Sequence, residues 1–92
     1  MEHKVINSVE ALLFGSGRPI RLSEIKSILE NTGLSVELSE IKRSINDLEI
    51  RYEGTSLQVT EVASGYRLQI EEDFSHILSA LWNEKAPRVS KA

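Results

Sequence analysis

The chain is predicted to form a single α+β domain of the winged-helix type, a variant of the helix-turn-helix. Three segments carry apolar residues at helical spacing, two short segments then alternate apolar and polar residues, and a fourth helical stripe follows. The order helix, short strand, helix, helix, hairpin, helix is that of a winged helix, in which the hairpin is the wing. Residues 1–83 are expected to make up this domain.

The first helix is expected over residues 5–14, where the glycine-containing stretch FGSGRPIRLS ends it. In a phosphate-binding loop, the glycines lead directly into a helix amino terminus. Here a connector intervenes, Pro19 lacks an N–H group, and Glu24 would repel an anion at the next helix. We therefore interpret the stretch as a corner between two helices, with Gly15 or Gly17 as a left-handed helix stop.

The connector and the second helix follow this corner. Residues 19–22 alternate apolar and polar side chains after a proline, which predicts a short edge strand or an extended connector. Ser23 is expected to cap the second helix, and Glu24 places a negative charge in its first turn. Apolar residues within 25–29 form the inward stripe, and the helix is expected to end near residues 31–33.

The third helix has the most regular amphipathic pattern in the chain. Its apolar residues recur at steps of three, four, three and four, which places them on one face. They are Leu38, Ile41, Ile45, Leu48 and Tyr52. Ser35 and Ser39 are both candidate N-caps, and Gly54 is expected to close the helix.

A β-hairpin is predicted over residues 57–70, with Ser64-Gly65 as its tight turn. This turn would place Glu61 opposite Leu68 on the face where apolar residues should meet. A bulge near residues 60–62 would restore the pattern, and we expect one.

The fourth helix is expected to begin after the acidic run at residues 71–73, because a helix amino terminus favours negative charge. Its apolar stripe runs from Phe74 to Trp82. Residues 84–92 lose this pattern and mix charge, proline and small side chains. They are expected to be a linker or the start of a truncated second winged-helix domain.

Composition narrows the function classes. The 92 residues include no cysteine, which excludes disulfides and thiolate chemistry and fits a reducing cytoplasm. No apolar run approaches the roughly 18 residues that cross a bilayer, so no membrane association is expected. The net charge of −3 provides no global attraction to nucleic acid.

Catalytic and metal sites have little support. His3 and His76 are the two histidines, and Asp73 precedes His76 by one helical step. An Asp–His pair orients an imidazole, but a nucleophile and an oxyanion site would still be needed. Two distant histidines do not form a four-coordinate metal site. We therefore predict no catalytic residue, no metal and no cofactor, and interpret His76 as a solvated side chain.

DNA binding is the alternative function, because winged helices often place the third helix in the major groove. Phosphate contacts come mostly from lysine and arginine. The third helix is net negative, and the candidate basic spot is limited to Lys42, Arg43 and Arg67. A DNA-binding transcriptional regulator stays the second hypothesis, and sequence-specific DNA binding is not expected.

Surplus apolar residues favour a protein interface. The first helix has apolar side chains on more than one side, and Trp82 adds to an already complete stripe on the fourth helix. Aromatic anchors tend to dominate protein contacts. The interface candidates are Phe14, Phe74, Leu81 and Trp82. The alternative is a wholly internal core with Trp82 as its lid.

Several segments together resemble the amino-terminal winged-helix domain of the ScpB family, the segregation and condensation protein B family. They are VEALLFGSGRPIRLSEI (residues 9–25), LEIRYEG (48–54), LQVTEVASGYRLQI (57–70) and PRVSKA (87–92). The hairpin segment is the specific part, because charged amphipathic helices are common. The last segment is similar to the entry into the family's second winged helix.

This resemblance implies a non-enzymatic partner of the bacterial SMC condensation complex. ScpB-like proteins pair as homodimers and bind the kleisin subunit ScpA, which connects them to SMC. The resemblance therefore implies a homodimer, ScpA and SMC as partners, a role in chromosome segregation, and a location at the nucleoid in the cytoplasm.

Overall fold

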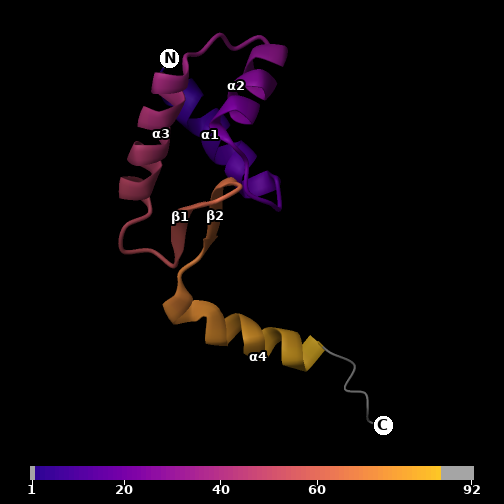
Figure 1. Cartoon of the computed structure of the whole chain (residues 1–92). Coiled ribbons are helices and arrows are strands. Elements are labelled where there is room, and N and C mark those ends of the chain that lie inside the picture. The colour runs from indigo at the N-terminus through magenta and orange to yellow at the C-terminus, as the bar shows by residue number, and fades with distance from the viewer. Residues whose placement is uncertain (1, 86–92) are drawn as a thin grey trace.

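The computed structural model describes residues 2–85 and confirms the predicted α+β winged helix. A three-helix unit is followed by an antiparallel hairpin, and a fourth helix then leads away from both (Figure 1). The elements are α1 (Glu2–Gly15), α2 (Leu22–Asn31), α3 (Leu38–Arg51), β1 (Leu57–Val62), β2 (Gly65–Ile70), the 3-10 turn η1 (Glu72–Phe74) and α4 (Ser75–Lys85).

The core lies between the three helices and one face of the hairpin. Helix α1 packs against α3 and β2, and α2 packs against α3. Each element contributes the side chains that its periodicity places inward, so the predicted stripes of the first three helices are confirmed as buried or half-buried, except Leu38 at the start of α3, which is 45% exposed. The buried apolar residues are Val9, Leu13, Ile20, Ile25, Leu29, Val36, Ile41, Ile45, Leu48, Val59 and Tyr66.

The glycine-containing stretch is a corner, as predicted. Gly17 adopts a left-handed backbone with φ of +70°, which ends the turn after α1. Arg18 donates to both carboxylate oxygens of Glu24, with Nη2–Oε2 at 2.6 Å. This pair lowers the pKa of the Glu24 carboxyl, first through the hydrogen bonds, and occupies the region where a phosphate would have to lie.

Two local predictions around this corner are wrong. The connector forms no strand, only an isolated bridge between Ile20 and Tyr66. Ser23 does not cap α2, because Leu22 already belongs to the helix and Arg21 is the N-cap residue. Leu22 is half-buried and packs against the core, and the helix begins two residues earlier than it would with Ser23 as its N-cap.

Helix α3 begins differently from either predicted cap. Glu37, rather than Ser35 or Ser39, is the N-cap residue, and its backbone N–H donates to Glu40 Oε1 at 2.9 Å. The loop before it is fixed by Lys26, whose Nζ donates to the carbonyl of Val36 at 2.7 Å. A charged capping box therefore sets the start of this helix.

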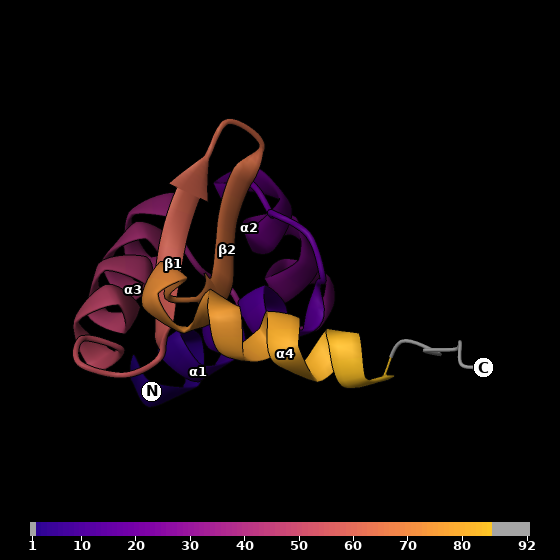
Figure 2. The same ribbon diagram turned by 90° about the horizontal axis from the view of Figure 1, so that it is seen from below.

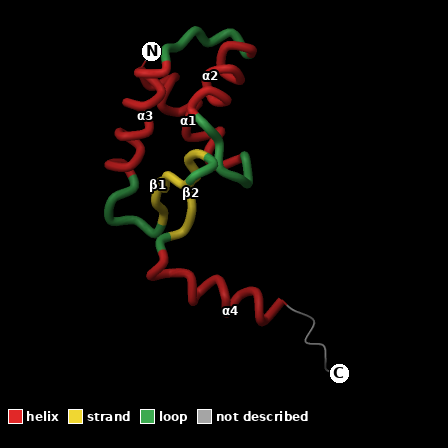
Figure 3. Tube along the Cα trace, in the orientation of Figure 1, coloured by secondary structure: helices red, strands yellow, loops and turns green. Residues whose placement is uncertain are grey.

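The hairpin has an unbroken register, so the predicted bulge is wrong. Its turn is Ala63-Ser64, one residue earlier than predicted, which pairs Val62 with Gly65. In this register Val59 faces Leu68 on the core side, and the apolar alternation needs no correction. Figure 3 shows the two strands between the loop after α3 and the start of α4.

Gly65 holds the wing against the corner. Its φ is +135°, and a Cβ built on it would lie 2.4 Å from the carbonyl carbon and oxygen of Ile20. The neighbouring residue, Tyr66, exchanges two backbone hydrogen bonds of 2.8 Å with Ile20. The close approach of these backbones requires a glycine here.

Helix α4 leaves the domain instead of folding onto it. The backbone N–H of Glu71 donates to the carbonyl of Ser56 at 2.8 Å, which fixes the chain where the hairpin ends. From there α4 extends past the hairpin (Figure 1), and the view from below shows its length running clear of α3 (Figure 2). Among the described elements, α4 packs chiefly against η1, the turn that precedes it.

Candidate protein-interaction surface

Helix α4 presents an exposed apolar face. Phe74, Leu81 and Trp82 are 39%, 47% and 62% exposed, and Ile77 between them is 55% exposed. Together with the half-buried Leu78, these residues recur at steps of three and four, which places them in two adjacent rows of one face. The alternative of Trp82 as the lid of an internal core is wrong, because α4 does not return to that core.

The sequence of α4 explains why this face is uncharged. From Ser75 to Asn83 the helix contains no aspartate, glutamate, lysine or arginine. Acidic residues precede the helix at positions 71–73, where Ser75 Oγ donates to the carbonyl of Glu72 at 2.8 Å, and Glu84 follows the apolar face near the end of α4. A helix without charges on its apolar side is typical of the centre of a protein interface, where charged residues are depleted.

Phe14 lies on a second apolar surface, at the carboxyl end of α1. Its side chain is 76% exposed, the most of any large apolar residue that the structure describes. It borders a hollow whose remaining lining comes from α1, α3 and both strands. The lining residues are Asn7, Glu10, Ala11, Phe14, Tyr52, Leu57 and Leu68.

A polar network closes one side of this hollow. Tyr52 donates its hydroxyl to Glu10 Oε2, and Arg51 Nη1 donates to Glu10 Oε1 at 2.9 Å. The hydrogen bond to Glu10 raises the pKa of the Tyr52 phenol, and partial burial adds to the effect. The network connects α1 to the end of α3, so the hollow has a rigid wall.

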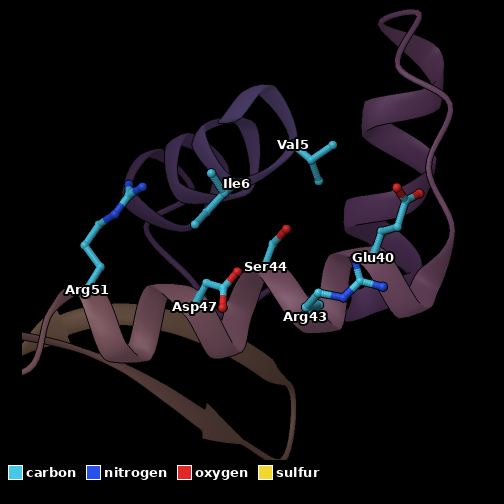
Figure 4. A pocket seen from close by; sticks show the side chains of 7 residues that line it. All are labelled: Val5, Ile6, Glu40, Arg43, Ser44, Asp47 and Arg51. Carbon is cyan, nitrogen blue, oxygen red and sulfur yellow. The ribbon is translucent and has the colours of Figure 1, made fainter. Parts of the chain in front are cut away.

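Another hollow lies between α1 and the outer part of α3 (Figure 4). Val5 and Ile6 supply its apolar part, and Arg43 lies along α3 with the acidic Glu40 and Asp47. Mixed charges in this arrangement offset one another. The hollow therefore has no net positive potential that would select phosphate.

The three basic candidates for nucleic-acid contact do not form a built site. Lys42 and Arg43 are exposed on α3, with Arg43 beside two carboxylates. Arg67 is half-buried on β2, where it pairs with Thr60 across the hairpin, and its Nε atom is buried without a hydrogen-bond partner. These positions show no arrangement of guanidinium groups directed at a common anion.

Only His76 of the two histidines has a described side chain. His76 is exposed on α4, as is Asp73 in η1. His3 belongs to α1, and its side chain lies outside the described part of the chain. Between residues 2 and 85, no group of three or more histidine, cysteine or acidic side chains is arranged to hold a metal ion. No described helix is long and apolar enough to cross a membrane.

Some exposed apolar residues were not among the predicted interface candidates. Ile77 belonged to the predicted α4 stripe, and its exposure became visible only when the structure showed α4 without a partner. Ile50 is 65% exposed on α3, and Leu38 and Val62 are also exposed. Ile50 follows the third-helix stripe by two residues, a spacing that predicts the solvent side of the helix.

A model of the family described as "Segregation and condensation complex subunit ScpB" matches residues 7–92 of this chain. The chain belongs to the ScpB family. A curated "Segregation and condensation protein B homolog" from Coxiella burnetii (strain RSA 493 / Nine Mile phase I) is 37% identical to it over 80 residues. That match covers 87% of this chain but 31% of the relative, so the chain spans about a third of that ScpB homologue.

Solved structures agree with this assignment. A dimer of the ScpB N-terminal domain complexed with ScpA peptide matches with a TM-score of 0.69 and 28% identity, over 82% of this chain and 84% of that one. A conserved hypothetical protein from Chlorobium tepidum matches with a TM-score of 0.70 and 28% identity, over 87% and 49%. ScpB from Mycobacterium tuberculosis, at 14% identity, shows the same fold with a TM-score of 0.82, over 94% and 52%.

Proposed function

We propose that this chain is a non-enzymatic accessory subunit of the SMC–ScpA–ScpB complex, which acts in chromosome condensation and segregation at the nucleoid in the cytoplasm. It pairs as a homodimer and binds the kleisin ScpA. The observation that carries the proposal is the exposed, uncharged apolar face of α4, which includes Phe74, Leu81 and Trp82. Water contact with such a face is unfavourable, and a second polypeptide removes it.

The family relationship supports the choice of partner. The similar ScpB N-terminal domain was solved as a dimer with an ScpA peptide, and it covers most of this chain. The segment 35–53, which contains α3, has five acidic and three basic residues, and the hairpin has one of each. Together with the mixed charges around Arg43, this favours protein over phosphate as the binding partner. His76 is exposed on α4, as expected of a solvated side chain and not of an imidazole held in a catalytic pocket.

Sedimentation velocity of the 92-residue chain tests the pairing. We expect a dimer at tens of micromolar and expect Trp82→Ala to shift it toward monomer, with a dissociation constant raised about 30-fold, as for a hot-spot residue worth about 2 kcal/mol. Ile50→Ala is the matched control, because Ile50 is as exposed as Trp82 but lies on α3. A wild-type chain that stays monomeric at high micromolar concentration would remove the homodimer.

Binding to ScpA needs a separate measurement. Isothermal titration of purified ScpA into the wild-type chain is expected to give a saturable signal, with one protein partner for each dimer or each subunit. Circular dichroism checks that both proteins are folded. If they are folded and no heat of binding is measured, this domain does not bind the kleisin and only the pairing role is left.

A further inference from the structure

Helix α4 and the outer face of α1 are two unpartnered apolar surfaces on the same subunit, and they have matching properties. The face of α1 between Asn7 and Gly15 has one charged residue, Glu10, which is paired with Arg51 and Tyr52. Small residues lie on either side of the exposed Phe14. Hollows flank it: one contains Tyr52, Leu57 and Leu68, and the other, on the α2 side, contains Leu12, Ile20 and Ile28. Small residues between two apolar hollows allow a second helix to approach closely.

Within residues 2–85, α4 does not cover the α1 face of its own subunit. The hydrogen bond from Glu71 to Ser56 fixes the start of α4 at the open end of the hairpin, and α4 then extends away from the three-helix unit (Figure 1). Each subunit therefore has two exposed apolar surfaces, one on α4 and one on α1. Two copies related by a two-fold axis cover both surfaces, because each contact is repeated in reverse and the assembly closes at two.

We propose that the α4 helix of one copy docks on the α1 face of the other, between the two hollows, in a reciprocal exchange. This inference rests on the proposed homodimer and specifies which surfaces meet. Its rival is a dimer in which the two α4 helices pack on each other and both α1 faces stay exposed.

The available surface is sufficient for this arrangement. Five exposed apolar side chains contribute roughly 500 Å² per subunit, if each exposed fraction is multiplied by the 150–250 Å² that a large side chain buries. They are Phe14, Phe74, Ile77, Leu81 and Trp82. A standard interface buries about 800 Å² per partner, so these five side chains cover more than half of it. In the α4-to-α4 arrangement, Phe14 would contribute nothing.

The absence of cysteine from the sequence allows a direct test. Ala11 lies at the centre of the α1 face and Leu78 at the centre of the α4 face. We would prepare Ala11→Cys and Leu78→Cys separately and treat each alone, and then their mixture, with a short bismaleimide. Reciprocal docking predicts a covalent dimer in the mixture and none in either variant alone. Ser75→Cys, at the edge of the same α4 face, replaces Leu78→Cys if that variant fails to fold.

The outcomes separate this inference from the proposed function. Cross-linking of Leu78→Cys to itself would show α4-to-α4 packing, and cross-linking of Ala11→Cys to itself would show paired α1 helices. Either result, or a dimer in sedimentation that yields no cross-link in the mixture, overturns the reciprocal docking while the homodimer stands. A wild-type monomer in sedimentation overturns both.

Discussion

Gly65 shows how a single position determines the geometry of the wing. The neighbouring Ile20 backbone approaches so closely that a Cβ would lie 2.4 Å from two of its atoms and 2.8 Å from the nitrogen of Arg21. Backbone atoms cannot rotate away as a flexible side chain does. The bridge between corner and wing therefore depends on the absence of a side chain at this position.

Substitution of Gly65 by alanine is expected to destabilise the fold by about 3 kcal/mol or more, because overpacking adds to the strain of a positive φ. Urea unfolding followed by circular dichroism measures this loss. Gly33→Ala is the matched control: Gly33 also has a positive φ, of +94°, but open space where its Cβ would lie. Its cost is expected to be about 1 kcal/mol. Equal losses in the two variants would show that backbone conformation alone, and not the contact with Ile20, sets the cost.

Tyr52 makes the stability of the folded state depend on pH. Its pKa is raised above the ordinary value because its hydroxyl donates to Glu10. The protonated phenol is thus favoured in the folded state. The stability that it contributes is present below the unfolded pKa of about 10 and is lost as the pH rises through the folded pKa.

Tyr52→Phe is therefore expected to cost about 1 kcal/mol at pH 7, at the low end for hydrogen bonds to charged groups because the pair is half-exposed. At pH 11.5, above the unfolded pKa, the advantage of the wild-type protein should be smaller, since a phenolate beside the Glu10 carboxylate is disfavoured in the folded state. Urea unfolding of both proteins at the two pH values gives the comparison. A difference that stays constant between pH 7 and pH 11.5 contradicts a role for the phenol proton.

At the scale of elements, the sequence predicts the helices well and their ends poorly. The stripes of α1, α2 and α3 are confirmed apart from Leu38, because burial of one face repeats every turn and averages over many side chains. Ends depend on single interactions. The start of α3 comes from the Glu37–Glu40 box and that of α2 from packing of Leu22, while the three predicted serine caps had the better intrinsic capping preference.

In the hairpin, likewise, the sequence predicts the positions of the strands but not their register. Both strands are where the alternation predicts them, but the turn is Ala63-Ser64 instead of Ser64-Gly65. The preference of glycine for turns suggested the later position. Gly65 is instead required by the approach of Ile20, a contact between residues far apart in the sequence that local propensity cannot reveal.

The sequence predicted α4 as an amphipathic helix, but it did not predict that α4 would have no packing partner within the described part of the subunit. An apolar stripe indicates that a face will be covered but not by which chain, because burial within a subunit and burial between subunits leave the same periodicity. The exposure of Phe14 and Trp82 was therefore an open alternative in the sequence, and the structure resolves it in favour of exposure.

The charge of the whole molecule bears on the DNA-binding alternative. The net charge is −3, and Glu40 and Asp47 accompany Arg43 in the same hollow. We expect no saturable binding to a 20-base-pair duplex below about 100 µM at 150 mM salt, the weak limit of non-specific binding. Fluorescence anisotropy with labelled DNA measures this, and combined replacement of Lys42, Arg43 and Arg67 by glutamine should change nothing. Micromolar, salt-sensitive affinity that this triple variant loses would establish the regulator hypothesis.

The bridge between Ile20 and Tyr66 also determines where the domain can accept inserted residues. Two backbone hydrogen bonds join the corner to the wing immediately after the turn, so the strand from Gly65 onward has a fixed position relative to the helices. Extra residues inserted between Ala63 and Ser64 would lengthen the tip beyond the bridge and leave the rest in place. Extra residues after Tyr66 would slide β2 along β1 and rotate Leu68 out of the core. Relatives with longer wings should therefore carry their additional residues at the tip alone.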